Sequence, residues 1–382
     1  MWHRRMAIFF CWCAFGCLAR EPAPASKAAP STEQIRKWII ELGAARFDMR
    51  DQAMQALIGA GQQAVQPVLA AAHGNDREVA LRCVVALQEI GARGNTDALQ
   101  ATITALEQLA AREAIAPVVA RQATEARASL SAVRQERAIE YLQGLGAVIS
   151  READDQWYRS VAGFAVTVFS LEIGPQWQGT EKDLERISWI SDLEQVCFVG
   201  PQVKDSWFRY IQNLPKLNSV KLKRADITAK GLESLVQIEG IWFIRLLYLP
   251  LDDKAVQILM KSKPLRRLVF ISRQLTPQGR KQLQDHFGEL NVECPHGALL
   301  GITANAGDGQ SWMISQVIEG GAAAKAGILE KDRIVKFNGR PVPNFVVLKE
   351  YISENEPGDT AKFEIERGAE TVLVEVKFGE WE

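Results

Sequence analysis

The sequence lacks an excess of charge of either sign. Its 45 lysine and arginine residues are nearly balanced by 46 aspartate and glutamate residues, which gives a formal net charge of −1. Without a net positive field, the chain has no general attraction to phosphate backbones or to anionic membrane surfaces. The composition therefore argues against nucleic acid as a partner.

Cysteine is also scarce. The six cysteines fall into three near the start and three that are far apart: Cys11, Cys13 and Cys17, then Cys83, Cys197 and Cys294. No CxxC pair and no cysteine–histidine cluster has the spacing of zinc ligands, and three scattered cysteines make a poor disulfide framework. We therefore expect no metal site, and we interpret Cys83 and Cys197 as small core residues.

The first residues are basic and then apolar. His3, Arg4 and Arg5 precede an apolar run from Met6 to Ala19, which is short for a membrane-spanning helix and typical of a secretory leader. Residues 20–31 are rich in proline and alanine and predict a flexible tether. We expect export, with the folded part periplasmic or tethered to a membrane of the cell envelope.

Two cleavage sites fit residues 1–19. Cleavage after Ala19 gives a plain secreted protein, whereas cleavage before Cys17 resembles the processing of bacterial lipoproteins and makes Cys17 the lipidation site. Gly16 favours the second alternative. The bulky Phe15 and the alanine at Ala14, where a leucine is usual, favour the first, and the sequence leaves both open.

Residues 32–142 predict a region of paired helices. Alanine, glutamine, arginine and leucine dominate, and Pro67 and Pro117 are the only prolines in this range. The spacing of Phe47, Arg50, Ala53, Leu57 and Gly61, and then of Asp76 to Ile90, resembles HEAT-type helical repeats. The resemblance implies an all-α solenoid in which Arg50 and Arg82 donate hydrogen bonds between repeats rather than bind a ligand.

Residues 143–294 contain a repeat of 24 residues. Four units begin at Leu193, Leu217, Ile241 and Leu265, and apolar residues follow three and five positions after each start. Each unit predicts a short inward-facing strand and a helical return, and an earlier strand is one residue out of phase. The pattern is similar to leucine-rich repeats without their usual asparagine, which implies an α/β solenoid whose units bury their apolar edges against one another. Trp242 is the tryptophan that this periodicity places on the exposed side.

Residues 295–382 follow a different pattern. Leu299 to Ile302 precede a strand near Trp312, the segment from Glu319 to Ile328, the segment from Asp332 to Val342, a helix from about Phe345 to Glu354, and two strands joined at Arg367–Gly368. This order of motifs resembles a PDZ domain of the Deg-protease kind, which implies a small β-rich domain with a peptide-binding groove. Lys331 stands where that family usually has glycine, and we expect the change to affect a turn remote from the groove.

The turn at Leu300, Gly301 and Ile302 is the predicted centre of that groove. Consecutive amides in such a turn form a concave site for a terminal carboxylate, and glycine permits the backbone conformation. The following strand offers an edge to which a peptide can add as a further strand. We predict peptide contacts from the residues of the turn and its flanks, and from the helix: Leu299, Leu300, Gly301, Ile302, Val347 and Tyr351. Leu348 and Ile352 are predicted core residues, and the alternative is a closed groove in a domain that serves as a spacer.

Catalytic signals are lacking. The four histidines, His3, His73, His286 and His296, are not accompanied by a catalytic serine motif. The repeats occupy the place that the protease domain takes in Deg-type proteases. The glycine-rich segment 305–310 does not join a strand to a helix as phosphate-binding loops do, so we expect no cofactor.

The sequence thus predicts a non-enzymatic, multidomain scaffold of the bacterial cell envelope. Its expected partner is a protein or peptide with an apolar C-terminal residue, and its oligomeric state is left open. The alternative is a regulatory or substrate-presenting partner of an envelope protease, with the active site on another chain.

Overall fold

A computed structural model describes residues 29–112, 115–151, 168–295, 297–305 and 312–380. The predicted leader with its Cys17, residues 20–28 of the tether, and His3 and His296 lie outside the described residues. The chain divides into two compact units, residues 1–131 and 132–382. Within the described ranges, no helix is both long enough and apolar enough to cross a bilayer.

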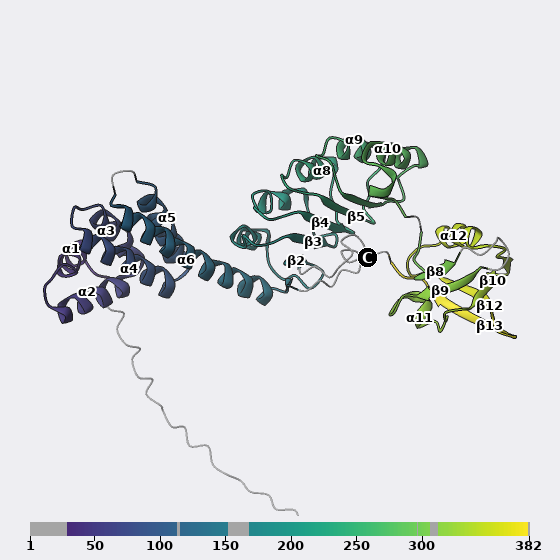
Figure 1. The fold of residues 1–382 in the computed structure, drawn as a ribbon, viewed down its shortest axis with the longest axis horizontal. Helices are drawn as coiled ribbons and strands as arrows, with labels where there is room; N and C mark the ends of the chain where they lie inside the picture. The colour runs from purple at the N-terminus through teal and green to yellow at the C-terminus, as the bar shows by residue number, and fades with distance from the viewer. Residues whose placement is uncertain (1–28, 113–114, 152–167, 296, 306–311, 381–382) are drawn as a thin grey trace, which may run out of the picture. The chain divides into compact units, whose positions relative to one another are not determined.

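The N-terminal region is helical (Figure 1). Its elements are α1 (Thr32–Glu41), α2 (Phe47–Ala60), α3 (Gln62–Ala72), α4 (Arg77–Arg93), α5 (Thr96–Ala110) and α6 (Pro117–Gly144). Side chains of Ser31, Asp76 and Asn95 accept hydrogen bonds from first-turn amides and so begin α1, α4 and α5. Alanine, leucine and valine side chains of α2 to α5 form a closely packed interior, because their apolar positions recur at helical spacing.

The two arginines singled out in this region act as hydrogen-bond donors within the protein. Arg82 Nη1 of α4 lies 2.6 Å from the carbonyl oxygen of Leu42, directly after α1. Arg50 Nη1 of α2 lies 2.9 Å and 2.7 Å from the carbonyl oxygens of Ala44 and Ala45. Both guanidinium groups thus hold the connection between α1 and α2. The bonds of Arg50 are local, to the connection that precedes its own helix, whereas the sequence analysis expected both arginines to donate between repeats.

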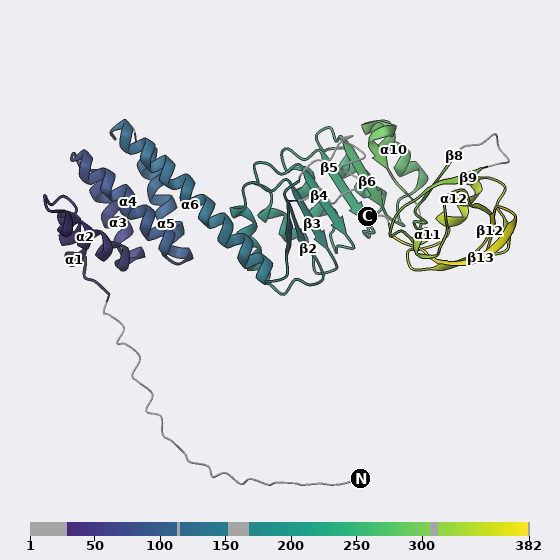
Figure 2. The same cartoon turned by 60° about the horizontal axis from the view of Figure 1, so that its bottom comes forward.

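The next region is a seven-stranded sheet in the sequence order β1 to β7. Figure 2 labels its strands β2 to β6. The strands are β1 (Val148–Ser150), β2 (Ser170–Ile173), β3 (Gln195–Val199), β4 (Ser219–Lys223), β5 (Phe243–Leu247), β6 (Arg267–Ile271) and β7 (Val292–Glu293). All pairs are parallel except β1 with β2. The register aligns Val196, Val220, Ile244, Leu268 and Val292, so paired residues from β3 to β7 are 24 apart.

The first parallel pair departs from this spacing by one residue. Leu171 of β2 pairs with Val196 of β3, a separation of 25. The sequence predicted both the 24-residue spacing and the displaced first strand, because the apolar positions alone fix which residues of a strand face the core.

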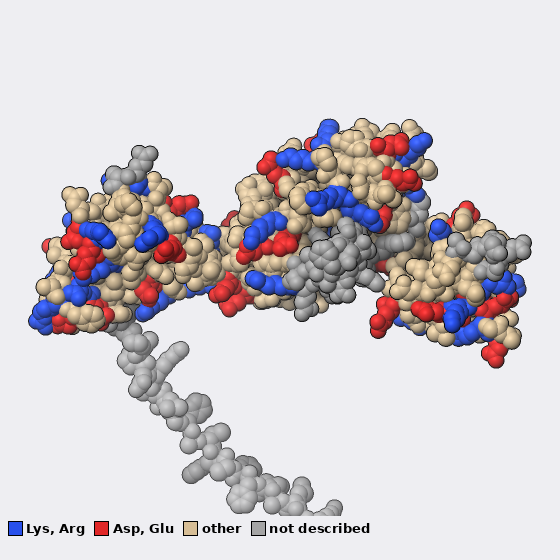
Figure 3. Space-filling view, in the orientation of Figure 1, with Lys and Arg blue, Asp and Glu red and all other residues tan. Residues whose placement is uncertain are grey.

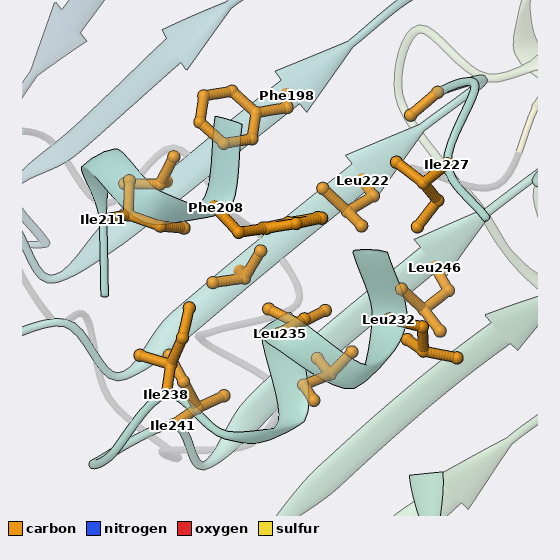
Figure 4. Packing of buried hydrophobic residues seen from close by; sticks show 14 of the residues in the cluster. Phe198, Phe208, Ile211, Leu222, Ile227, Leu232, Leu235, Ile238, Ile241 and Leu246 are labelled. Carbon is orange, nitrogen blue, oxygen red and sulfur yellow. The ribbon is translucent and has the colours of Figure 1, made fainter. Parts of the chain in front are cut away.

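Helical segments return the chain along one side of the sheet. They are η1 (Glu181–Trp189), η2 (Asp205–Tyr210), α8 (Ala229–Val236), α9 (Asp253–Leu259), α10 (Pro277–Phe287) and η3 (Glu289–Asn291). Figure 4 shows Leu222 and Leu246 of adjacent strands packed towards Leu232 and Leu235 of α8, and Phe198 of β3 lying towards η2. All five side chains are fully buried, so the core lies between the sheet and these helices.

Tryptophan and cysteine burial agrees with the sequence interpretation. Trp242 is 44% exposed, whereas Trp207 is buried and forms an edge-to-face contact with Phe198 at 5.3 Å. Cys83 and Cys197 are buried. Burial raises the pKa of the Cys83 thiol to about 12, so this group stays protonated and serves as packing.

Two aspartates join consecutive helical segments of the sheet region, a feature that the sequence analysis missed. Asp205 accepts hydrogen bonds from the amide and hydroxyl of Thr228, at 2.9 Å and 2.5 Å. Asp253 accepts the same pair of bonds from Thr276, at 2.9 Å and 2.6 Å. We call each arrangement an Asp–Thr clamp; the two clamps are 48 residues apart in the sequence.

A glycine follows each of these threonines at the third position. A Cβ atom on Gly231 would lie 2.1 Å from Asp205 Oδ1, and one on Gly279 would lie 2.5 Å from Asp253 Oδ1. The glycines therefore leave the space in which the aspartate carboxylates sit.

The C-terminal region is β-rich. It contains β8 (Ile302–Asn305), β9 (Met313–Val317), α11 (Ala322–Lys325), β10 (Arg333–Phe337), β11 (Arg340–Pro341), α12 (Phe345–Ser353), β12 (Thr360–Arg367) and β13 (Glu370–Lys377). One sheet has the order β11-β10-β12-β13, and β8 pairs with β9 in a second sheet. The helix and the final hairpin fall where the sequence predicted them. The hydrophobic core of this C-terminal region includes Phe337, Phe363 and Leu348.

Charged side chains of both signs are interspersed on the face drawn in Figure 3. Neither sign covers a whole helical or sheet region in this view, in keeping with the balanced composition. On this face, a binding site would therefore depend on local geometry rather than on a large electrostatic potential of one sign.

Candidate peptide-binding site

The segment that leads into β8 is fixed at its first residue. The amide of Leu299 lies 3.0 Å from the carbonyl oxygen of Gly379, and the amide of Gly379 lies 2.9 Å from the carbonyl oxygen of Leu299. This isolated bridge connects the loop to Gly379, which lies two residues after the end of the last strand. The backbone of Leu299 is thus used within the domain, and its side chain is partly buried.

The next two residues use their carbonyl groups but not their amides. The carbonyl oxygen of Leu300 accepts from the amide of Ala323 at 2.8 Å, and that of Gly301 accepts from Ile318 at 2.9 Å. Within the described residues, the amides of Leu300 and Gly301 have no hydrogen-bond acceptor. A loop held by its carbonyls, with its amides left for a ligand, has the polarity of an anion-binding nest.

Gly301 has the backbone conformation that this loop requires. Its φ is +79°, in the left-handed region that favours glycine. A Cβ atom there would be 3.6 Å from the nearest atom, the Cα of Gly321, which is ordinary contact. The requirement for glycine at this position is therefore conformational rather than steric.

Strand β8 has a partner on one side. It pairs antiparallel with β9, Ile302 opposite Val317, and no other strand of the described chain pairs with it. The open edge carries backbone groups to which an extended segment can add as a further strand. Leu300 is buried and Ile302 partly buried against the same core, so the loop and the first residue of β8 present an apolar base.

Helix α12 has two distinguishable sides beside its core residues. Leu348 and Ile352 are buried, as predicted. On one side, the ring of Phe345 lies 5.5 Å from that of Trp312, the residue before β9. On the other side, the ring of Tyr351 lies 5.7 Å from that of Phe337 in β10.

The helix contacts predicted for the groove are therefore not all brought together with the loop. The Arg340 guanidinium of β11 lies 3.8 Å above the ring of Tyr351, so Tyr351 faces β10 and β11. Helical spacing places Val347 on that side too. The side nearer the β8–β9 hairpin carries Phe345 and Lys349, whose ammonium nitrogen lies 5.5 Å from the Phe345 ring centre.

Phe345 and Lys349 were missed by the sequence analysis. The core positions Leu348 and Ile352 restrict the groove to one of two sides of the helix, and both sides carry an aromatic residue. The sequence signal that separates them is Trp312, because an aromatic residue at the start of β9 needs an apolar partner on the helix.

Lys331 occupies a strained turn in the same domain. Its φ is +69°, the left-handed conformation that the glycine expected at this position adopts without cost. Its amide lies 2.8 Å from the carbonyl oxygen of Ile314. The departure from the family pattern thus falls on a turn, as predicted.

The adjacent Asp332 is buried and paired. Arg367 donates to its two carboxylate oxygens at 2.9 Å and 2.8 Å, and the amide of Leu329 donates at 2.8 Å. Burial is the largest single influence and would raise the pKa of Asp332, but these hydrogen bonds and the Arg367 charge together lower it. The carboxylate is therefore ionised at neutral pH and joins the start of β10 to the end of β12.

The histidines and acidic residues do not form a metal-binding group in the part of the chain that the structure describes. His73 directly follows α3, and His286 lies on α10 with its ring 4.6 Å from that of Phe287. These positions belong to the helical and sheet regions rather than to the loop at Gly301.

Comparison with known proteins adds a family for one region. Residues 298–378 match the family model described as PDZ domain. The periplasmic pH-dependent serine endoprotease DegQ of Escherichia coli (strain K12) is 36% identical over 63 residues, which are 16% of this chain and 14% of that protein. The chain thus spans about a seventh of the length of this curated relative.

Two solved structures of proteases have partial similarity to this chain. The serine endoprotease from Yersinia pestis is 22% identical, with a TM-score of 0.21, over 27% of this chain and 33% of that one. An HtrA-type protease with a decapeptide is 17% identical, with a TM-score of 0.23, over 28% of this chain and 35% of that one. The sequence match, the order of elements and the loop at Gly301 agree: the C-terminal region is a PDZ domain of the Deg/HtrA kind.

Proposed function

We propose that this chain is a non-enzymatic protein-interaction scaffold of the bacterial cell envelope whose PDZ domain binds the C-terminal or extended segment of another protein. The single observation that carries the proposal is the loop before β8, where the amides of Leu300 and Gly301 have no acceptor among the described residues. These amides adjoin the open edge of β8, which supplies the main-chain partners for a peptide strand.

The peptide would end with its carboxylate at the amides of Leu300 and Gly301 and its last side chain against the apolar base. Leu300 and Ile302 belong to the same core cluster, so the base favours an apolar final residue. Within the groove, we assign the helix side to Phe345 and Lys349 in place of Val347 and Tyr351. Tyr351 remains a structural contact of Phe337 and Arg340.

The two preceding regions would provide further protein-binding surfaces. The 24-residue register of β3 to β7 and the helices along one side of the sheet support a leucine-rich-repeat solenoid. The bonds from Arg82 and Arg50 to the α1–α2 connection support HEAT-type repeats. We assign no catalytic step to either region.

An envelope location is consistent with the periplasmic relative and with the basic-then-apolar start of the chain. Export would expose the folded regions to the periplasm, either free or tethered through a lipid at Cys17. Mass spectrometry of the mature N-terminus tests this: a diacylated Cys17 supports the tethered form, and an intact Met1 on the abundant species contradicts export.

A second function is favoured by the similarity to DegQ, a serine endoprotease. In this alternative the chain presents substrates to, or regulates, a separate envelope protease. Recovery of a protease with this protein from an envelope fraction, and a change in its activity on adding the purified chain, would support the alternative over a passive scaffold.

The groove itself is tested with the full chain and a peptide selected for an apolar free C-terminus. Amidation of that peptide removes the carboxylate but keeps the last side chain. Charge-assisted hydrogen bonds are worth about 1.5 to 3 kcal/mol, so we expect binding in calorimetry to weaken by roughly ten- to a hundredfold. Equal affinity of the two peptides would show that the loop does not read chain ends.

Gly301→Val tests the same loop from the protein side. A β-branched residue is strained at a φ of +79°, so the variant should distort the amides and weaken binding of the free-acid peptide. Gly339→Val is the matched control, because Gly339 has a φ of +80° and lies in the turn between β10 and β11. Equal losses of affinity in the two variants would indicate general destabilisation rather than a role of this loop.

A further inference from the structure

A carboxylate at the end of the described PDZ domain is held by the sheet region. Strand β13 ends at Lys377, and Glu380 follows shortly after it. One carboxylate oxygen of Glu380 lies 2.6 Å from the ammonium nitrogen of Lys223, the last residue of β4. The other oxygen forms an ion pair with Arg224, the next residue of the chain. Both regions belong to the second compact unit, so two consecutive cations of one region bind one carboxylate of the other.

The backbone of Arg224 explains how both cations reach the same carboxylate. Consecutive side chains of a regular strand point to opposite faces of the sheet. Arg224 leaves the strand conformation with a φ of +52°, in the left-handed region. Gly200 stands at the same position of the preceding unit, with a φ of +109°. Arginine is therefore strained where the earlier unit has glycine, and such strain is concentrated at functional positions.

The carboxylate of Glu380 is ionised in this setting. Burial is the largest single influence and would raise its pKa, but the hydrogen bond from Lys223 and the charges of Lys223 and Arg224 together lower it. The Lys223 side chain is 16% exposed and that of Glu380 is 29% exposed. A second ion pair between the regions, Arg273 with Glu356, is more exposed, so solvent screens it more strongly.

Glu380 directly follows the residue that fixes the start of the peptide-binding loop. The backbone of Gly379 exchanges two hydrogen bonds with that of Leu299, at 3.0 Å and 2.9 Å. Leu299 directly precedes the two residues whose amides we propose for the peptide carboxylate. On the other side of Gly379, Phe378 is buried in the core of the PDZ domain. The loop is therefore bonded to a residue that lies between an anchor in this core and an anchor on the sheet region.

We infer that Glu380 is a positioning residue through which the sheet region fixes the carboxylate-binding loop of the PDZ domain. This inference rests on the proposed binding of a free C-terminus at that loop. Lys223 and Arg224 hold Glu380. Glu380 in turn restrains Gly379, which holds the backbone of Leu299. A restrained loop loses less conformational freedom when a peptide binds, so these contacts raise the affinity without touching the peptide.

The test uses the full chain and the selected peptide in its free-acid and amidated forms, with affinities measured by calorimetry. Glu380→Gln keeps the shape of the side chain and removes its charge. The free-acid peptide should then bind about two- to fivefold more weakly, the range that an ion pair near the surface supplies. The amidated peptide should lose less, because it lacks the carboxylate that the loop amides bind. High salt should reduce the difference between the variant and the native chain, because exposed charges are screened.

Variants of the sheet region assign the effect to its cations. Arg224→Gly removes the guanidinium group and suits the left-handed backbone, so urea unfolding should show no loss of stability while the free-acid peptide binds more weakly. When Lys223→Met and Arg224→Gly are both present, adding Glu380→Gln should have no further effect on affinity, which a double-mutant cycle measures. Glu356→Gln is the matched control, because it removes the ion pair with Arg273 and should leave the affinity nearly unchanged.

The outcomes separate this inference from the proposed function. Unchanged affinity in Glu380→Gln, with the amidated peptide still bound more weakly than the free acid, overturns the role of Glu380 and leaves recognition of the chain end intact. Equal losses in Glu380→Gln and Glu356→Gln, equal losses for the two peptides, or additive effects in the cycle also overturn it. Failure of every free-acid peptide to bind the native chain overturns both proposals.

Discussion

The sheet region and the PDZ domain differ in whether their strands are hydrogen-bonded to neighbours on both sides. Strands β2 to β6 each have a neighbour on both sides, so their backbone donors and acceptors are used within one continuous sheet. Strand β8 has a neighbour on one side, and the loop before it keeps amides without acceptors among the described residues. The first arrangement contributes stability, whereas the second leaves main-chain groups for another chain.

The largest loss of stability is expected when buried side chains are removed from the core of the sheet region. Leu222→Ala and Leu246→Ala remove fully buried side chains from adjacent strands, and each should lower the free energy of unfolding by about 2 to 5 kcal/mol. Urea unfolding followed by tryptophan fluorescence measures the loss. Leu290→Ala is the control in the same region, because Leu290 is 87% exposed. Unchanged stability in both core variants would contradict the observed register.

The Asp–Thr clamps come next in expected effect. Asp205→Ala removes two hydrogen bonds to Thr228 at the start of α8, and the loss of such a capping carboxylate should cost about 1 to 2 kcal/mol. Asp226→Ala, at an exposed position in the same region, should cost much less. Equal effects of the two substitutions would argue against a role for the clamp.

Gly231, which lies against Asp205, provides a second test of the clamp. Gly231→Ala places a methyl group against Asp205 and should destabilise the native chain, but it should be tolerated when Asp205→Ala is also present. A double-mutant cycle measures this coupling. Additive effects would show that the carboxylate and the glycine do not depend on each other.

A smaller effect is expected in the PDZ domain, where strain rather than packing is changed. Lys331→Gly should raise the free energy of unfolding by about 1 kcal/mol, because glycine adopts a φ of +69° without the steric cost that lysine bears. The affinity for the free-acid peptide should be unchanged, which calorimetry can check. A loss of stability would mean that the lysine side chain contributes more than its backbone strain costs.

The smallest effect concerns acid stability of the sheet region. Hydrogen bonds from Tyr141 and then from Thr180 lower the pKa of Asp183 to about 2, from an ordinary value of 3.8. Since the folded state favours the ionised carboxylate, this contribution is present above about pH 4 and is lost as the pH falls towards about 2. Tyr141→Phe should therefore lower stability at pH 7 and have less effect at pH 2. The site is near the surface, so solvent screens the effect.

Much of the sheet region could be predicted from sequence because its apolar residues recur at fixed intervals. One repeated strand determines the register of the next, including the displacement between β2 and β3. The loop at Gly301 was also predictable, since glycine between apolar residues implies a special backbone conformation. The exposure of Trp242 followed from the same periodicity.

The side of α12 that borders the groove could not be obtained in this way. Helical spacing fixes Leu348 and Ile352 as core residues, but it does not say which side faces β8 and which faces β10. That choice depends on long-range contacts, of Phe345 with Trp312 and of Tyr351 with Phe337. The Asp–Thr clamps were missed because each joins polar residues 23 positions apart, outside the apolar repeat.

The clamps also constrain how this region can change in length. Loss of residues 229–252, one period, would join Thr228 to Asp253 and place Ala255 where Gly231 now leaves room for Asp205. Loss of residues 229–276, two periods, would join Thr228 to Pro277 and bring Gly279 to that position. Insertions and deletions that preserve the Asp–Thr clamps should therefore involve two 24-residue units at a time. The structural repeat of this sheet is then 48 residues long, twice the period of its apolar residues.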